Sequence, residues 1–118
     1  MNKKTIIMVI MMTSKRVFEL IYDSEVAQHL APIERKYYGL IRRTIEQQLS
    51  HEPDVEIRNR KALLRPIAFE ATWEIRFSPA NRFRVFYEID FMQCEVYILA
   101  IGVKRANRLL IGEEEFEL

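Results

Sequence analysis

The sequence has a single cysteine and only two histidines among its 118 residues. Cys94 alone cannot form an internal disulfide, which favours a reduced, cytoplasmic compartment. His29 and His51 lie far apart and lack the spacing of metal ligands. No run approaches the roughly 18 apolar residues that span a bilayer. We therefore expect a cytoplasmic protein with no metal, no cofactor and no membrane contact.

A strong charge of either sign is also missing. Lysine and arginine number 18 against 17 acidic residues, a net charge of +1, so the overall charge does not indicate a nucleic-acid binder. Hydrophobic residues make up 49% of the chain and charged residues 30%, which excludes a disordered chain. A chain of this length can bury one ordinary core.

The first sixteen residues differ from the rest. Lys3 and Lys4 precede an uninterrupted apolar run, Ile6–Met12. This order resembles a secretory signal, but Thr13–Arg16 follows in place of a small-residue cleavage pattern. The run could instead form a short buried strand or helical turn, or pair two copies of the chain.

Translation could also begin inside this segment, because it contains further methionines: Met8, Met11 and Met12. We treat residues 1–16 as a leader of unassigned role and residues 17–118 as one domain.

The first half of this domain reads as a strand and two helices. Val17–Tyr22 is rich in β-formers, and residues 25–30 form a short helix after the capping residues Asp23 and Ser24. Pro32 suits the start of a second helix. An apolar stripe at helical spacing follows it: Ile33, Tyr37, Leu40, Ile41, Thr44, Ile45, Gln48 and Leu49. His29 is expected to be a partly exposed helix residue.

The second half alternates as strands do. Trp73, Ile75 and Phe77 share one face, a turn follows at 78–81, and Arg82–Asp90 alternates again. Residues 95–103 are almost wholly apolar, as in a central strand. Residues 55–71 show no clean period, and the acidic tail is expected to be a frayed helix. Trp73 and Tyr87 are expected to belong to the core.

The order strand, helix, helix and three strands predicts an α+β fold. We expect a small antiparallel sheet with the two N-terminal helices packed on one face, and a helix at the C-terminus. The opposite face is expected to be solvated and to carry Glu74, Arg76, Arg82, Arg84 and Glu88.

Three segments resemble the RelE/ParE superfamily of bacterial type II toxins. Residues 83–89 (FRVFYEI) resemble its arginine-bearing hairpin strand, and residues 98–104 (ILAIGVK) resemble its last strand with a basic ending. Residues 61–65 (KALLR) echo a segment before the hairpin. The resemblance covers about residues 17–112 and implies a fold of the β-α-α-β-β-β type.

The resemblance implies a toxin neutralised by a cognate antitoxin. RelE members are ribosome-dependent mRNA endoribonucleases (mRNA interferases) that inhibit translation, whereas ParE members act on DNA gyrase. By position, Arg84 matches the hairpin arginine, Lys104 or Arg105 the basic ending, and Arg76 a lysine of the nuclease members. Glu74 replaces a second lysine, and Leu109–Ile111 occupy the region of a terminal tyrosine.

These residues suggest a metal-independent RNA-cleaving site at Arg84, Arg76, Glu74 and Lys104. Arg76 and Arg84, on neighbouring strands, could clamp one phosphate, because guanidinium groups bind phosphate in a two-pronged way. The same arginines could instead pair with Glu74 and Glu88. Glu74 is one candidate base; Lys61 and Lys104 are the other groups that could transfer a proton.

The segment from Arg58 to Arg84 contains seven cationic residues and only two acidic ones, Glu70 and Glu74. This local surplus favours a polyanion or an acidic protein partner. The residues assigned to substrate contact are Arg58, Arg60, Lys61, Arg65, Arg82 and Arg105.

Three functions therefore remain open: a toxin that cleaves mRNA on the ribosome, a ParE-like toxin that binds a protein such as gyrase, and a degenerate interaction protein without toxicity. A free general base on the polar face favours the enzyme. Glu74 and Glu88 held by Arg76 and Arg84 favour the other two.

Overall fold

The computed structural model describes residues 17–65, 67 and 69–117. The leader, and every expectation for it, including contact between two copies, lies outside this part of the chain.

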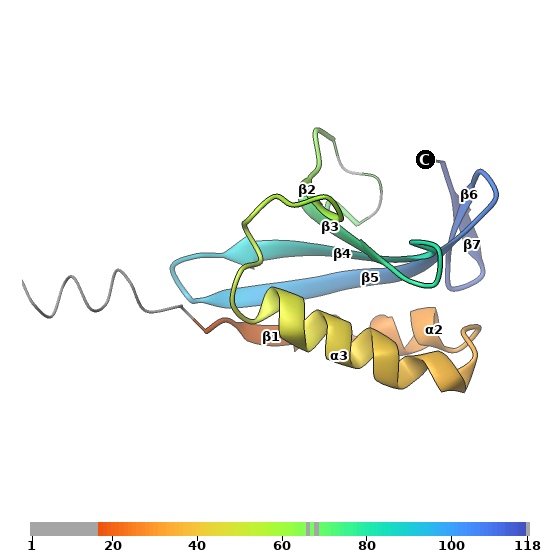
Figure 1. The fold of residues 1–118 in the computed structure, drawn as a ribbon, viewed down its shortest axis with the longest axis horizontal. Helices are drawn as coiled ribbons and strands as arrows, with labels where there is room; N and C mark the ends of the chain where they lie inside the picture. The colour runs from red at the N-terminus through yellow and green to blue at the C-terminus, as the bar shows by residue number, and fades with distance from the viewer. Residues whose placement is uncertain (1–16, 66, 68, 118) are drawn as a thin grey trace, which may run out of the picture.

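The described chain is an α+β fold in which helices lie along one side of a long sheet (Figure 1). Its elements follow in this order: β1 (Glu19–Tyr22), α2 (Val26–Leu30), the 3₁₀ turn η1 (Arg35–Tyr37), α3 (Tyr38–Leu49), β2 (Arg60–Ala62), β3 (Trp73–Phe77), β4 (Phe83–Asp90), β5 (Glu95–Arg105), β6 (Arg108–Ile111) and β7 (Glu114–Phe116). No helix among these residues is long and apolar enough to cross a membrane.

β5 is the central strand, as its apolar sequence predicts. The sheet runs β2-β3-β4-β5-β6-β7 with antiparallel neighbours, and β1 pairs with β5 in parallel. The expectation of a wholly antiparallel sheet is therefore wrong for β1. A hairpin turn forces neighbouring strands to be antiparallel, but two helices separate β1 from the other strands, so nothing imposes that direction on it.

One face of the sheet carries the predicted core. Buried residues of the helical region, Ile33, Ile41 and Ile45, belong to one cluster with strand residues such as Phe83 and Val85. This confirms the inward stripe. The Tyr87 hydroxyl donates to the Pro53 carbonyl at 2.6 Å, and its ring stacks on Trp73.

The second helix begins later than predicted. Glu34 has extended backbone angles, and only from Arg35 does the chain wind into η1 and then α3. Ile33 is nevertheless buried, because the turn after α2 directs it into the core.

The C-terminal helix is also a wrong prediction, because the tail forms the β6–β7 hairpin. Gly112 turns it with a φ of 63°, a conformation that favours glycine. Leu109 and Ile111 alternate inward and join Phe86, Ala71 and Ala100 in a second apolar cluster on the other face of the sheet.

β2 is a strand that the sequence did not reveal. Its three residues carry no apolar alternation, and it forms by pairing with β3, where Lys61 lies opposite Glu74.

Candidate functional site

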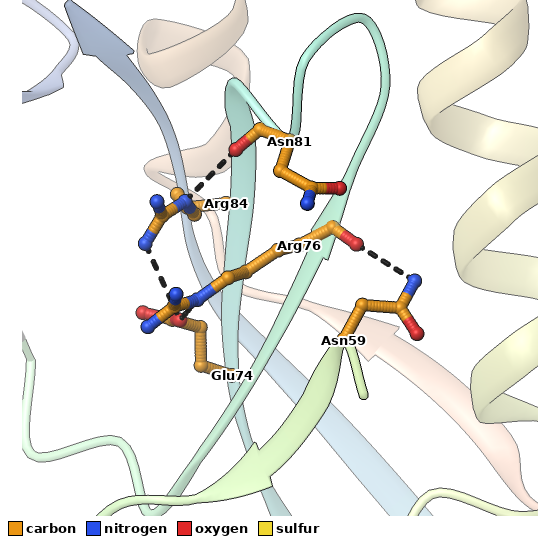
Figure 2. A network of polar contacts seen from close by, with 5 residues as sticks. All are labelled: Asn59, Glu74, Arg76, Asn81 and Arg84. Carbon is orange, nitrogen blue, oxygen red and sulfur yellow. Dashed lines mark hydrogen bonds and ion pairs between the residues drawn. The ribbon is translucent and has the colours of Figure 1, made fainter. Parts of the chain in front are cut away.

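The β3–β4 pair brings three of the predicted catalytic residues together. Arg76 lies directly opposite Arg84 in the register. Glu74 is two residues before Arg76 on β3 and therefore projects from the same face. Figure 2 shows the two guanidinium groups converging on the Glu74 carboxylate.

Both arginines contact the same carboxylate oxygen. The Arg76 Nε donates a hydrogen bond to Glu74 Oε1, and the Arg84 Nη1 lies 3.5 Å from that oxygen. The Arg84 Nε also donates to the Asn81 carbonyl at 3.1 Å. On the other side, the Asn59 amide donates to the Arg76 carbonyl at 3.0 Å (Figure 2). The loop before β2 and the β3–β4 turn thus help to fix this network.

Two of the three side chains are buried, so the expected solvated face is wrong here. The Glu74 side chain is 1% exposed and that of Arg84 6%, whereas Arg76 remains 44% exposed. Glu74 lies opposite Phe86 and Arg84 opposite Gly102, beside the second apolar cluster. The β6–β7 hairpin supplies much of that cluster. Because the tail was expected to be a helix, the sequence did not predict that this hairpin would cover Glu74 and Arg84.

Burial has an electrostatic consequence for Arg84. It lowers the pKa of the guanidinium from its ordinary value, while the negative charge of Glu74 opposes that effect. The second oxygen, Glu74 Oε2, is buried without a hydrogen-bond partner among the described residues. Arg76 alone of the three presents a large part of its side chain to solvent.

Further basic residues line the same face or the end of the sheet. Lys61 lies opposite Glu74, and Lys104 is two residues beyond Gly102, which pairs with Arg84. These lysines therefore share the face of the arginine pair.

Arg82 lies elsewhere than predicted. Its guanidinium packs 5.2 Å from the centre of the Tyr37 ring, at the helix side of the sheet end. With Arg105 it lines a small depression there.

The remaining residues assigned to substrate contact are not gathered at one place. Arg58 and Arg65 are exposed loop residues. Arg60 is buried, and its guanidinium donates to the Val55 carbonyl and to Gln48 Oε1. Arg60 thus ties β2 to α3 and is withdrawn from the surface.

Glu88 is exposed on β4, and no ion pair joins it to the two arginines in the described part of the chain. The carboxylate that holds them is Glu74.

His29 is a buried polar residue that sequence reasoning missed. It is 5% exposed, and its Nδ1 accepts a hydrogen bond from the Ile101 backbone N–H at 3.3 Å. The expected partial exposure is therefore wrong. The spacing of Val26, His29 and Leu30 on one helical face is the signal that could have revealed it.

Arg76 is exposed enough to bind an anionic group, whereas Glu74 and Arg84 are too buried for a ligand to reach. Across the described residues, no group of three or more histidine, cysteine or acidic side chains is placed to hold a metal ion.

No protein-family model matches this chain, and no curated protein sequence matches it.

Proposed function

We propose that this chain is a RelE/ParE-like toxin subunit that acts by binding a protein target, without cleaving RNA. The observation that carries this proposal is the state of Glu74, which is buried and bound by both Arg76 and Arg84. A general base must reach the 2′-hydroxyl of its substrate, and a side chain that is 1% exposed cannot do so. The strand-helix-helix-strand order adds support at the level of fold.

The surface left open suits a carboxylate-bearing partner. Arg76 is half-exposed at the end of β3, and Lys104 of β5 shares its face of the sheet, while Arg82 and Arg105 lie on the helix side of the same sheet end. Guanidinium groups bind carboxylates in a planar, two-pronged way, and such a cluster steers an acidic partner by its field. A cognate antitoxin with an acidic segment is a second protein that would fit this surface.

The test is to induce the chain in bacteria while following growth and the integrity of mRNA on translating ribosomes. We expect growth to stop while mRNA stays intact. Arg76→Ala should relieve the arrest, whereas Arg43→Ala, an exposed arginine of α3, should not. Circular dichroism would check that each variant folds.

RNA cleavage is the second candidate function, because Lys61, Arg76 and Lys104 share one face of the sheet. Lysines could transfer protons there without Glu74. Specific mRNA cleavage by the wild type, lost in a folded Lys61→Ala or Lys104→Ala variant, would establish the nuclease in place of the binding protein. Harmless expression of the wild type would favour the degenerate, non-toxic member.

The antitoxin has its own test. Co-expression with the product of the neighbouring gene should yield a stable complex and restore growth. A neighbour that neither binds nor protects would remove this part of the proposal.

A further inference from the structure

One edge of the central strand β5 is shared by two short strands that leave a gap. β1 pairs with Glu95–Ile98, and β6 pairs with Gly102–Arg105. β4 runs along β5 on the other edge. Between the two short strands, the backbone N–H of Ile101 donates to Nδ1 of His29 at 3.3 Å. A side chain of α2 therefore takes the place of a strand.

His29 is one of the side chains that attach α2 to the sheet, together with Val26 and Leu30, which pack in the core. The helix has five residues and no side-chain N-cap, and Val26 and His29 are its two buried residues. The imidazole packs on Phe69, with 5.4 Å between ring centres, and lies beside the Gly112 turn. Removing its hydrogen bond would leave the buried Ile101 N–H without its acceptor.

The imidazole borders two cavities whose charged lining residues are, taken together, three carboxylates and one guanidinium. One, of about 710 Å³, is lined by Glu25 before α2 and by Glu113 and Glu114 at the β6–β7 turn. The other, of about 210 Å³, adds Arg105 of β5. Asp23, in the turn after β1, also acts on the ring through its charge. Two carboxylates thus act on His29 through their charge, and two more, with one guanidinium, line the cavities that it borders.

We propose that His29 is a pH-sensitive anchor: the neutral imidazole holds α2 against β5, and the protonated ring releases it. Accepting at Nδ1 requires the neutral ring with its proton on Nε2. Protonation converts Nδ1 into a donor facing another donor, the Ile101 N–H, so the hydrogen bond is lost. The imidazolium is then attracted to the carboxylates that line the cavity.

The direction of the effect follows from burial. Burial lowers the pKa of His29 from its ordinary value, and Glu25 and Asp23 only oppose this in part. The attached helix therefore binds a proton less readily than a released, solvated histidine does. Attachment is complete above the ordinary pKa of about 6.5 and weakens as the pH falls below it, towards the lower value of the attached state.

Hydrogen exchange of the Ile101 amide, followed by NMR from about pH 7.5 to about pH 5.5, tests this proposal on the full chain. We expect its protection factor, corrected for intrinsic exchange, to fall by up to about tenfold per pH unit below about 6.5. In His29→Asn, whose amide oxygen can occupy the place of Nδ1 but does not titrate, protection should not depend on pH. The control is His51→Asn, since His51 is exposed and should leave the wild-type response unchanged.

A second readout needs no variant. The nitrogen shifts of the His29 ring should report an unprotonated Nδ1 at neutral pH and should titrate together with the loss of Ile101 protection. Protection of Ile101 that is constant across this range, or a ring that titrates without affecting it, would overturn the proposal. An unchanged pH response in a folded His29→Asn protein would also overturn it.

Discussion

At the scale of single residues, Glu74 connects a buried cation to a half-exposed one. Arg84 is buried, so its charge depends on Glu74 for compensation, whereas Arg76 can be solvated by water. The structural contributions of the two arginines should therefore differ, although both contact the same oxygen.

We predict that Glu74→Gln lowers the free energy of unfolding by about 3–5 kcal/mol, because it leaves a buried guanidinium uncompensated. The matched substitution Glu88→Gln, on the exposed side of β4, should change it by less than about 0.5 kcal/mol. Urea unfolding monitored by tryptophan fluorescence measures both. Equal effects of the two substitutions would show that the Arg84 charge is compensated elsewhere.

The positions of Glu74, Arg76 and Arg84 were predicted from the sequence, but the burial of Glu74 and Arg84 was not. The hairpin alternation correctly placed Glu74, Arg76 and Arg84 on one face. The burial of Glu74 and Arg84 depends on the second apolar cluster, to which Leu109 and Ile111 contribute from the far end of the chain. Alternation assigns a side chain to a face of a strand and contains no information about what later covers that face.

At the scale of elements, the β6–β7 hairpin depends on one glycine in β5. A Cβ atom on Gly102 would lie 2.9 Å from Leu109 Cδ1 and 3.1 Å from the Leu110 carbonyl oxygen. The Leu110 carbonyl oxygen belongs to the backbone of β6, which pairs with β5, so a side chain at position 102 would crowd this pairing.

We predict that Gly102→Ala destabilises the protein by about 1–3 kcal/mol through overpacking. Gly39→Ala is the control, since its new Cβ would meet only the Arg43 guanidinium, which is on a long side chain. Within α3 that change should be neutral or stabilise by up to about 1 kcal/mol, because alanine favours helix. Thermal unfolding of the two variants compares them, and a destabilisation shared by both would mean that the β6 contact is not its cause.

Packing of the helical layer on the hairpin rests on Phe83. This residue is 1% exposed and contacts the rings of Tyr37 and Phe77. Phe83→Ala should cost about 3–5 kcal/mol, measured by urea unfolding, because it leaves a cavity between the layers. A cost below about 1 kcal/mol would show that the helices settle into the space.

Elements with an apolar period, an apolar run or a β-rich composition were predicted from the sequence, and those without such a signal were not. The stripe through Ile41 and Ile45 identified α3, and alternation identified β3 and β4. β2 has only three residues and no alternation, so its pairing with β3 alone creates it. The helix prediction for the tail is wrong because the alternation of Leu109 and Ile111 spans only two apolar positions before the acidic residues begin. So short an alternation does not indicate a strand.

At the scale of the whole molecule, the described residues from Val17 onward contain both apolar clusters. We therefore predict that a chain beginning at Met12 folds as stably as the full-length chain, within about 1 kcal/mol. Thermal unfolding of the two proteins provides the comparison. A loss of several kcal/mol on truncation would show that the leader is an integral part of the domain.

The parallel pairing of β1 with β5 has a consequence for synthesis. Glu19 lies opposite Glu95. The first strand of the described chain can therefore pair only after β5, much later in the sequence, has been synthesised. Contacts this distant in sequence close slowly, because a long loop must be ordered first. On the ribosome, the N-terminal strand and its helices leave the exit tunnel well before β5 is available to cover their apolar side chains. A nascent chain that stalls before β5 has been made cannot form the β1–β5 pairing. Its apolar side chains stay exposed, so the chain depends on chaperones to protect it or on proteases to remove it.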